Sequence, residues 1–186
     1  MTELPLIITI QGQINECTTI IANSIYCKYI FTAGRDWSVA QGSMEGITQT
    51  AKRGSDNVCV FNYPLNVSFK ASKPYGWPQL IVALYGRNPF GNEMVIGYGA
   101  IHVPTQPGRH QLEIQLFRPA SASIMQTIIG FFSGITPEYI DLKFIASGSD
   151  REVTTTRSQG TLTVTFNILL RGLQALDLIV QKEQNK

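Results

Sequence analysis

The stretch Thr161-Leu162-Thr163-Val164-Thr165-Phe166-Asn167-Ile168 alternates strictly between polar and apolar side chains. Successive side chains of a β-strand point to opposite faces, so the apolar ones here would share one face and the threonines and asparagine the other. This pattern is typical of an antiparallel strand with one face on a core and one toward solvent. The stretch therefore predicts a sheet with one buried face.

Other parts of the chain carry the same signal. The alternation recurs at residues 4–10, 65–70 and 111–116. Strands that are more deeply buried or rich in β-forming residues are expected at residues 26–31, 80–85 and 94–103. Clusters of Pro, Gly and Asn separate these runs and indicate turns. About eight strands with this spacing predict an all-β fold, an antiparallel β-sandwich.

Two segments depart from the strand pattern and predict one or two short helices. Residues 120–132 follow Pro119 and place Ile124, Ile128 and Phe131 at helical spacing. A second helix is predicted near the end of the last strand from the spacing of Leu169, Leu173, Leu176 and Val180. We find no internal repeat, linker or low-complexity tract, so we expect a single domain over residues 1–186.

The charge of the chain is low and nearly balanced. Fifteen Lys and Arg against thirteen Asp and Glu give a net charge of +2, too small to indicate a nucleic-acid partner. Charged residues make up 15% of the chain, whereas about 25% is typical of soluble domains. Either the surface is built from Thr, Ser, Gln and Asn, or part of it is covered by a partner. Composition leaves both explanations open.

Membrane insertion and secretion are not indicated. No apolar run reaches the roughly 18 residues that a membrane-spanning helix needs. The first residues, Met-Thr-Glu-Leu-Pro, lack the basic and apolar regions of a secretory signal. We therefore expect a cytoplasmic protein.

Residues that bind metals are few and scattered. Cys17, Cys27 and Cys59 form no C-x-x-C pair, so we expect reduced, mostly buried thiols rather than a disulfide framework or a zinc site. His102 and His110 are separated by a turn rich in Pro and Gly, which disfavours a shared metal ion. The aspartates include no Asp-x-Asp pair, so the cluster of carboxylates that Ca²⁺ requires is not indicated. We expect no cofactor.

Catalytic motifs are not matched either. Gly97-Tyr98-Gly99-Ala100-Ile101-His102 begins like a dinucleotide-binding fingerprint but has histidine in place of the third glycine. The chain contains no Gly-x-Ser-x-Gly elbow and no Walker lysine loop. We therefore expect that the protein is not an enzyme and has no catalytic residues.

The distinctive surface candidates are aromatic and basic. Pro74-Tyr75-Gly76-Trp77-Pro78 places two large amphipathic rings in a rigid turn, where they either pack over one end of the sandwich or face a partner or a membrane. Arginine is enriched at interfaces, although solvated arginines on strand edges are the alternative for each one. The candidate partner or membrane surface consists of Tyr75, Trp77, Arg109, Arg151 and Arg157.

Several motifs occur together in a fixed order. They include Tyr26-Cys27-Lys28-Tyr29, Gly34-Arg35-Asp36-Trp37, Asn62-Tyr63-Pro64, Pro74-Tyr75-Gly76-Trp77-Pro78-Gln79, His102-Val103-Pro104, Pro107-Gly108-Arg109-His110, Pro137-Glu138-Tyr139 and Arg157-Ser158-Gln159-Gly160. Taken together, the chain resembles the B9 domain family of ciliary proteins over roughly residues 5–170. The segments that begin at Pro74 and at Arg157 are the specific ones. Residues 15–25 and the tail after Arg171 do not follow the family pattern.

The resemblance implies a C2-like β-sandwich without enzymatic activity, with its core at about residues 5–170. Residues 171–186 are expected, from their own leucine spacing, to form a C-terminal helix or tail. It implies a structural subunit of the tectonic-like (Meckel syndrome) complex at the ciliary transition zone, beside the basal body of the cytoskeleton. There the chain would bind other B9-domain proteins and other components of the complex. The assembly supports ciliogenesis and the diffusion barrier between ciliary and plasma membranes. The alternative function is a calcium-independent, peripheral lipid-binding module of the C2 type.

Overall fold

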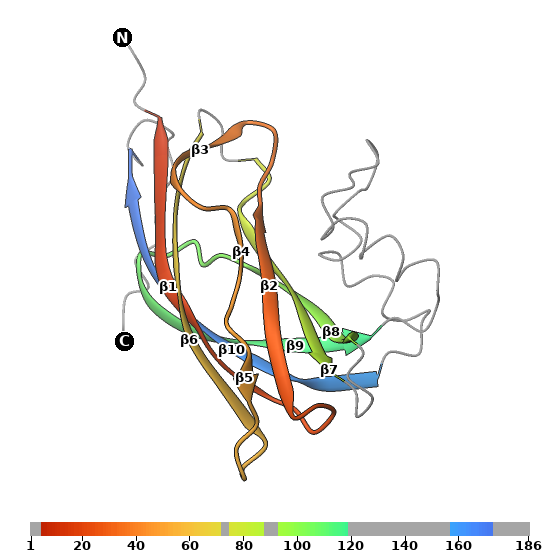
Figure 1. Ribbon diagram of the computed structural model, residues 1–186. Coiled ribbons are helices and arrows are strands. Elements are labelled where there is room, and N and C mark those ends of the chain that lie inside the picture. Colours follow the sequence, from red (N-terminus) through yellow and green to blue (C-terminus); the bar gives the residue numbers. More distant parts are fainter. Residues whose placement is uncertain (1–4, 72–74, 88–92, 119–156, 173–186) are drawn as a thin grey trace, which may run out of the picture.

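The computed structural model describes residues 5–71, 75–87, 93–118 and 157–172, which form ten antiparallel strands (Figure 1). The strands are β1 (Leu6–Thr18), β2 (Ser24–Thr32), β3 (Trp37–Gly42), β4 (Glu45–Ile47), β5 (Ala51–Lys52), β6 (Val58–Ala71), β7 (Gln79–Arg87), β8 (Glu93–His102), β9 (Gly108–Arg118) and β10 (Arg157–Arg171). These described ranges contain no helix, and so none long and apolar enough to cross a membrane.

The strands form two layers that face each other. Their order is β3-β6-β1-β10-β9-β8-β7-β2-β4, and β5 pairs with β2. In Figure 1 the first five strands of this order form one layer and the remaining strands form the other. At the corner between the layers, the register of β8 with β9 consists of the pair Tyr98 and Phe117. The expectation of an all-β antiparallel sandwich is confirmed.

One continuous segment, residues 37–52, links the layers on the opposite side. Its strand β3 pairs with β6 of the first layer, and its strand β4 pairs with β2 of the second. The Ser43 N–H donates to the Asn66 carbonyl at 3.2 Å, and the Phe31 N–H donates to the Met44 carbonyl at 2.7 Å. Gly42 has φ +88°, and a Cβ atom there would clash with the Asn66 carbonyl, so the turn requires glycine.

The inner faces of the two layers share one hydrophobic core. The alternating burial along β2 and β6 shows that one side of each strand faces inward. An edge-to-face series of rings crosses the core, with centroid distances of 6.3 Å from Phe31 to Phe69, 6.5 Å from Phe69 to Trp37 and 5.4 Å from Trp37 to Trp77. Burial of each large apolar side chain stabilises the fold by about 1.5–3 kcal/mol.

A smaller apolar cluster lies outside this core, on β7 and β8. Ile81, Ala83 and Tyr98 are fully buried, with Phe117 and Val95 among the partly buried residues packed against them. Strand β7 is therefore buried on both faces, as the apolar run at residues 80–85 predicted.

The structure differs from the sequence-based expectations in some of its strands and in the start of one predicted helix. Strands β3, β4 and β5 were not anticipated, because most of their side chains are exposed and carry no alternating pattern. The second predicted helix is wrong at its start: Leu169 continues β10 and pairs with Thr9 of β1. The rest of that helix and the predicted helix at residues 120–132 lie outside the described residues.

Replacing Phe69 by alanine tests the shared core. Phe69 is 1% exposed and contacts the rings of both Phe31 and Trp37. Phe69→Ala should therefore lower the free energy of unfolding by about 3–5 kcal/mol. The neighbouring side chain of Lys70 is exposed, so Lys70→Ala should change it by less than about 0.5 kcal/mol. Urea denaturation measures both values, and similar losses in the two variants would contradict a core at Phe69.

Candidate functional site

A groove of about 620 Å³ lies at one end of the second layer. The β1–β2 loop, the start of β2, strand β5 and the end of β7 line it. Strand pairing explains the arrangement: Ser24 of β2 is opposite Lys52 on one side, and Ile25 is opposite Gly86 on the other. Lys52 and Arg87 therefore flank the same end of β2, and both line the groove with exposed side chains.

Arg53 holds the loop that forms one wall of this groove. Its Nη1 donates to the Ile20 carbonyl at 2.9 Å, its Nη2 donates to Asn23 Oδ1 at 2.7 Å, and its backbone N–H donates to the Asn23 carbonyl at 2.8 Å. The planar guanidinium suits this two-pronged contact. As a result, the loop presents Ile20 and Ile21 at the surface, 75% and 36% exposed respectively.

Two stacked tyrosines continue the site along β2 and β7. The rings of Tyr26 and Tyr85 are parallel within 10°, with centroids 5.3 Å apart, and Lys28 Nζ lies 4.9 Å from the Tyr85 centroid. The Tyr26 hydroxyl donates to Glu93 Oε1 at 3.2 Å. Burial, assisted by the Glu93 carboxylate, raises the pKa of Tyr26 to about 12. Tyr26 is therefore a neutral hydrogen-bond donor at physiological pH.

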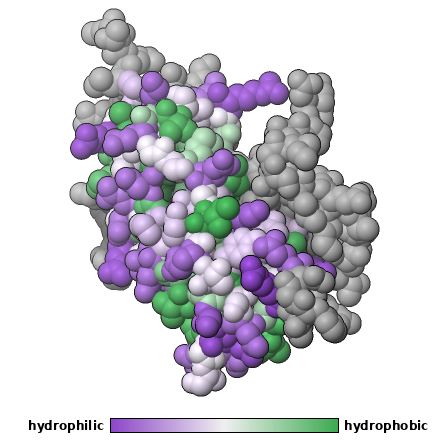
Figure 2. Space-filling view, in the orientation of Figure 1, coloured by the Kyte–Doolittle hydropathy of each residue, from purple (hydrophilic) through white to green (hydrophobic). Residues whose placement is uncertain are grey.

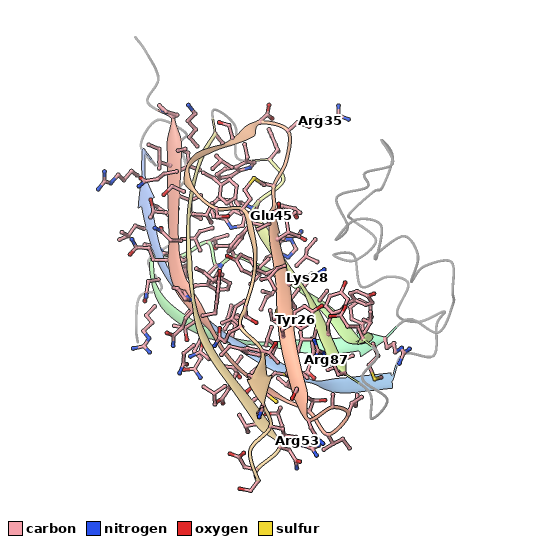
Figure 3. All side chains as sticks on the ribbon, in the orientation of Figure 1. Tyr26, Lys28, Arg35, Glu45, Arg53 and Arg87 are labelled. Carbon is pink, nitrogen blue, oxygen red and sulfur yellow. The ribbon has the colours of Figure 1, made fainter. Side chains whose placement is uncertain are left out.

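The charge around the groove is predominantly positive. Figure 3 shows Tyr26, Lys28 and Arg87 near one another over β2 and β7, with Arg53 toward the end of the sandwich and Arg35 at the opposite end. Glu93 is the register partner of Arg87 and offsets part of this charge. Figure 2 shows hydrophilic side chains over much of the same face, with apolar ones scattered among them.

The cysteines are poorly suited to act as nucleophiles or as metal ligands. Cys17 and Cys59 are opposite each other in β1 and β6, and they and Cys27 are buried and unpaired, as expected from the sequence. Burial, together with the nearby Cys59, raises the pKa of Cys17 to about 12, and burial also raises the pKa values of Cys27 and Cys59. Protonated thiols are poor nucleophiles and poor metal ligands. In the part of the chain that the structure describes, no three His, Cys, Asp or Glu side chains are placed to hold a metal ion.

The two predicted surface rings differ in their surroundings. Tyr75 is 75% exposed, and its carbonyl accepts a hydrogen bond from Trp37 Nε1 at 2.9 Å. Trp77 is half-buried and packs against the core, and its Nε1 donates to the Val103 carbonyl at 2.8 Å. Of the two rings, Tyr75 is therefore the one presented at the surface, and Trp77 has the packing role.

The two predicted arginines that the structure describes lie on β9 and β10. Arg109 is exposed on β9, opposite Asn167 of β10. Arg157 begins β10, opposite Arg118 of β9, and Arg151 lies outside the described residues. The groove residues Lys52 and Arg87 were missed, although Lys52-Arg53 is the one basic dipeptide of the sequence and offered a weak signal.

Comparison with known proteins identifies the family. The model of the B9-C2 family, described as "Ciliary basal body-associated, B9 protein", matches residues 8–169. The chain belongs to this B9 family. Membership confirms the resemblance read from the sequence, associates the chain with the ciliary basal body through the family description, and agrees with a C2-like sandwich.

Individual relatives agree with this assignment. The chain is 43% identical over 172 residues to mouse B9 domain-containing protein 1, covering 91% of this chain and 84% of the relative. The human protein of that name is 42% identical over the same shares of both chains. Rat B9 domain-containing protein 2 is 31% identical over 160 residues, covering 86% of this chain and 91% of the relative. Among solved structures, a C2 domain of plant Extended Synaptotagmin 1 matches with TM-score 0.43 and 10% identity, over 86% of this chain and 92% of that one.

The burial of the thiols predicts low reactivity in the folded state. We expect Ellman's reagent at pH 8 to modify the folded chain at least about 100-fold more slowly than the urea-unfolded chain, whose thiols have pKa values of about 8.5. Folding raises these pKa values, so the associated stability is complete below about pH 8.5 and declines as pH rises toward the pKa of about 12 at Cys17. Rapid modification of even one thiol in the folded protein would contradict this burial.

The contacts of Arg53 predict a local effect. Arg53→Gln removes both guanidinium bonds to the β1–β2 loop, each worth about 1 kcal/mol at a partly exposed site. Amide hydrogen exchange in residues 19–23 should become at least about fivefold faster. Arg35→Gln, at the opposite end of the sandwich, should leave this exchange unchanged (Figure 3). Equal exchange in both variants would show that Arg53 does not hold the loop.

Proposed function

We propose that this chain is a non-enzymatic structural subunit of the tectonic-like (Meckel syndrome) complex at the ciliary transition zone. In this role it binds other B9-domain proteins and further components of the complex, and it supports ciliogenesis and the diffusion barrier between ciliary and plasma membranes. Membership of the B9 family and the basal-body description of that family support the proposal. The structural observation that carries it is a broad, weakly charged surface on the first layer.

This surface, here called the neutral face, is the outer side of β6, β1, β10 and β9. Adjacent strands bring uncharged polar residues into rows: Gln11 lies between Asn66 and Asn167, and Thr9 lies between Ser68 and Leu169. The neutral face consists of Thr9, Gln11, Gln13, Asn66, Ser68, Gln111, Asn167 and Leu169. Interface centres are depleted of charged residues, so this composition suits a surface covered by another protein.

Charged residues flank the neutral face. Lys70 and Arg171 are register partners of Ile7 at one end, and Glu113 is opposite Thr163 toward the other. Along the β9 side, Arg109 is opposite Asn167. An uncharged centre with a charged rim is the usual arrangement of a protein interface. The low charged fraction of the sequence is thus accounted for in part by this face, and its neutral polar side chains also suit contact with a partner.

Leu169 supplies an apolar anchor on the neutral face. Its side chain is 56% exposed, whereas the side chains of Phe166 and Ile168 in the same strand are buried. An exposed aliphatic side chain that a partner removes from water contributes favourable free energy to binding. We therefore place Leu169 at the contact with a second B9 protein.

A matched pair of substitutions tests this contact. Leu169 on the first layer and Ile47 on the second are each 56% exposed. Leu169→Glu should weaken binding to a B9 domain-containing protein 2 by at least about tenfold, because the charge cannot be desolvated at the interface. Ile47→Glu introduces the same charge elsewhere and should leave binding within about twofold of the original chain. Isothermal titration calorimetry gives both affinities.

Size-exclusion chromatography with light scattering supplies the complementary test. The unmodified chain and the B9 partner should elute as one complex with the summed mass. A chain that stays a monodisperse monomer beside such partners, or a Leu169→Glu variant that binds as tightly as Ile47→Glu, counts against the proposed function.

A further inference from the structure

We propose that the groove between β5, β2 and β7 binds the phosphorylated headgroup of an anionic membrane lipid, of the phosphoinositide class. This site goes beyond the proposed function, because it lies on the second layer and needs no contact with the neutral face. The features of the groove that favour such a headgroup are its charge, its hydrogen-bond donors, its size and the apolar loop beside it.

The charges of the groove match a phosphate ester. Lys52 and Arg87 line it from opposite sides of β2, and both side chains are exposed. Arg53 bonds only to neutral oxygens of the β1–β2 loop in its described contacts, so these leave its positive charge uncompensated. Glu93 opposes Arg87 and accepts from Tyr26, which still leaves an excess of cations. Arginine and lysine are the usual partners of phosphate oxygens.

The lining also offers neutral donors and enough room. Ser24 and Thr50 contribute hydroxyl groups, and Asn23 contributes an amide beside them. The volume of about 620 Å³ falls within the range of about 300–1,000 Å³ that is common for small-molecule sites. A phosphorylated cyclic polyol carries both anionic oxygens for the cations and hydroxyl groups for these donors.

The β1–β2 loop favours a lipid as the source of this headgroup. Ile20 is 75% exposed, and its carbonyl is held by Arg53 next to the groove. An exposed aliphatic side chain beside a basic patch is typical of proteins that lie on an anionic membrane, because the apolar group enters the interface while the cations meet the headgroups. A site that binds a soluble phosphate would not require an exposed isoleucine beside it.

The site is separate from the exposed ring of Tyr75. Ser24 begins β2 and lies at the groove, whereas Thr32 ends the strand and pairs with Gln79, close to the turn that carries Tyr75. Nine residues of extended strand span about 30 Å, so the groove and this turn lie at opposite ends of the sandwich. A membrane bound at the groove therefore needs no contact with Tyr75.

Sedimentation with vesicles tests the proposal on the full-length chain. Phosphatidylcholine vesicles that contain a small fraction of phosphatidylinositol bisphosphate should bind the chain, and pure phosphatidylcholine vesicles should not. The double variant Lys52→Ala, Arg87→Ala should lower the affinity about 25-fold, since each basic residue near an anionic surface contributes about fivefold. The control Arg35→Ala, Lys70→Ala removes the same charge from exposed positions away from the groove and should change the affinity less than about twofold.

A third variant separates a lipid from a soluble ligand. Ile20→Ser should weaken vesicle binding while leaving binding of free inositol trisphosphate unchanged. Free inositol trisphosphate bound as tightly as the vesicles, together with no effect of Ile20→Ser, would overturn the assignment to a lipid. Equal losses in the groove variant and the charge-matched control, or no binding of the original chain, would overturn the site itself.

Two checks keep these results interpretable. All substituted side chains are exposed, so the melting temperature of each variant should match that of the original chain. If the double variant Lys52→Ala, Arg87→Ala has a lower melting temperature, the double variant Lys52→Gln, Arg87→Gln takes its place in the assay. Calorimetry of the groove variant with a B9 partner, without vesicles, should give the unaltered affinity. Failure of the lipid site and failure of the proposed assembly role are therefore distinguishable.

Discussion

The register of β1 is the constraint on which the first layer depends. This strand lies between β6 and β10 and pairs with both along most of its thirteen residues. Because side chains alternate with a period of two, a shift of one residue would turn Ile8 and Ile10 outward and Thr9 and Gln11 into the core. The burial of the isoleucines therefore holds the neutral face in place, and no separate interaction is needed to orient its polar residues.

A local irregularity preserves this arrangement along the whole strand. The register of β1 shifts between Ile14 and Glu16 against both neighbours, and beyond the shift Cys17 again faces the core. A bulge of this kind adds one residue and raises the local twist of the strand. The first layer can thus curve toward the second while its apolar side chains stay inside.

Side chains also alternate between the inner and outer faces of the second layer, but here apolar residues occupy part of the outer face as well. Its strand β7 is buried on both faces, so the outward side of this layer carries an apolar cluster near Ile81 and Tyr98 and becomes polar and basic only toward Arg87. The basic groove lies where the cluster ends and the β1–β2 loop begins. Its exposed side chains contribute little to the core, so their chemistry can change without loss of the fold.

Most strands of the fold are predictable from the sequence, whereas the residues of the groove are not. Alternation predicts strands wherever one face meets a core, and so it found β1, β2, the second half of β6 and β7 to β10. It could not find β3, whose side chains after Trp37 are exposed, and it extended a helical spacing into Leu169, where pairing with Thr9 continues the strand. Lys52 and Arg87 come together only through pairing across β2, which no local pattern in the sequence expresses.

The two proposed surfaces occupy the outer sides of opposite layers. The neutral face lies on β6, β1, β10 and β9, and the groove lies on β5, β2 and β7, with the shared core between them. A protein bound to the first layer therefore leaves the groove open, and a membrane at the groove leaves the neutral face free. The same sandwich can in this way connect a protein partner to a lipid surface without a conformational change, because the core fixes the strands that carry both sets of side chains.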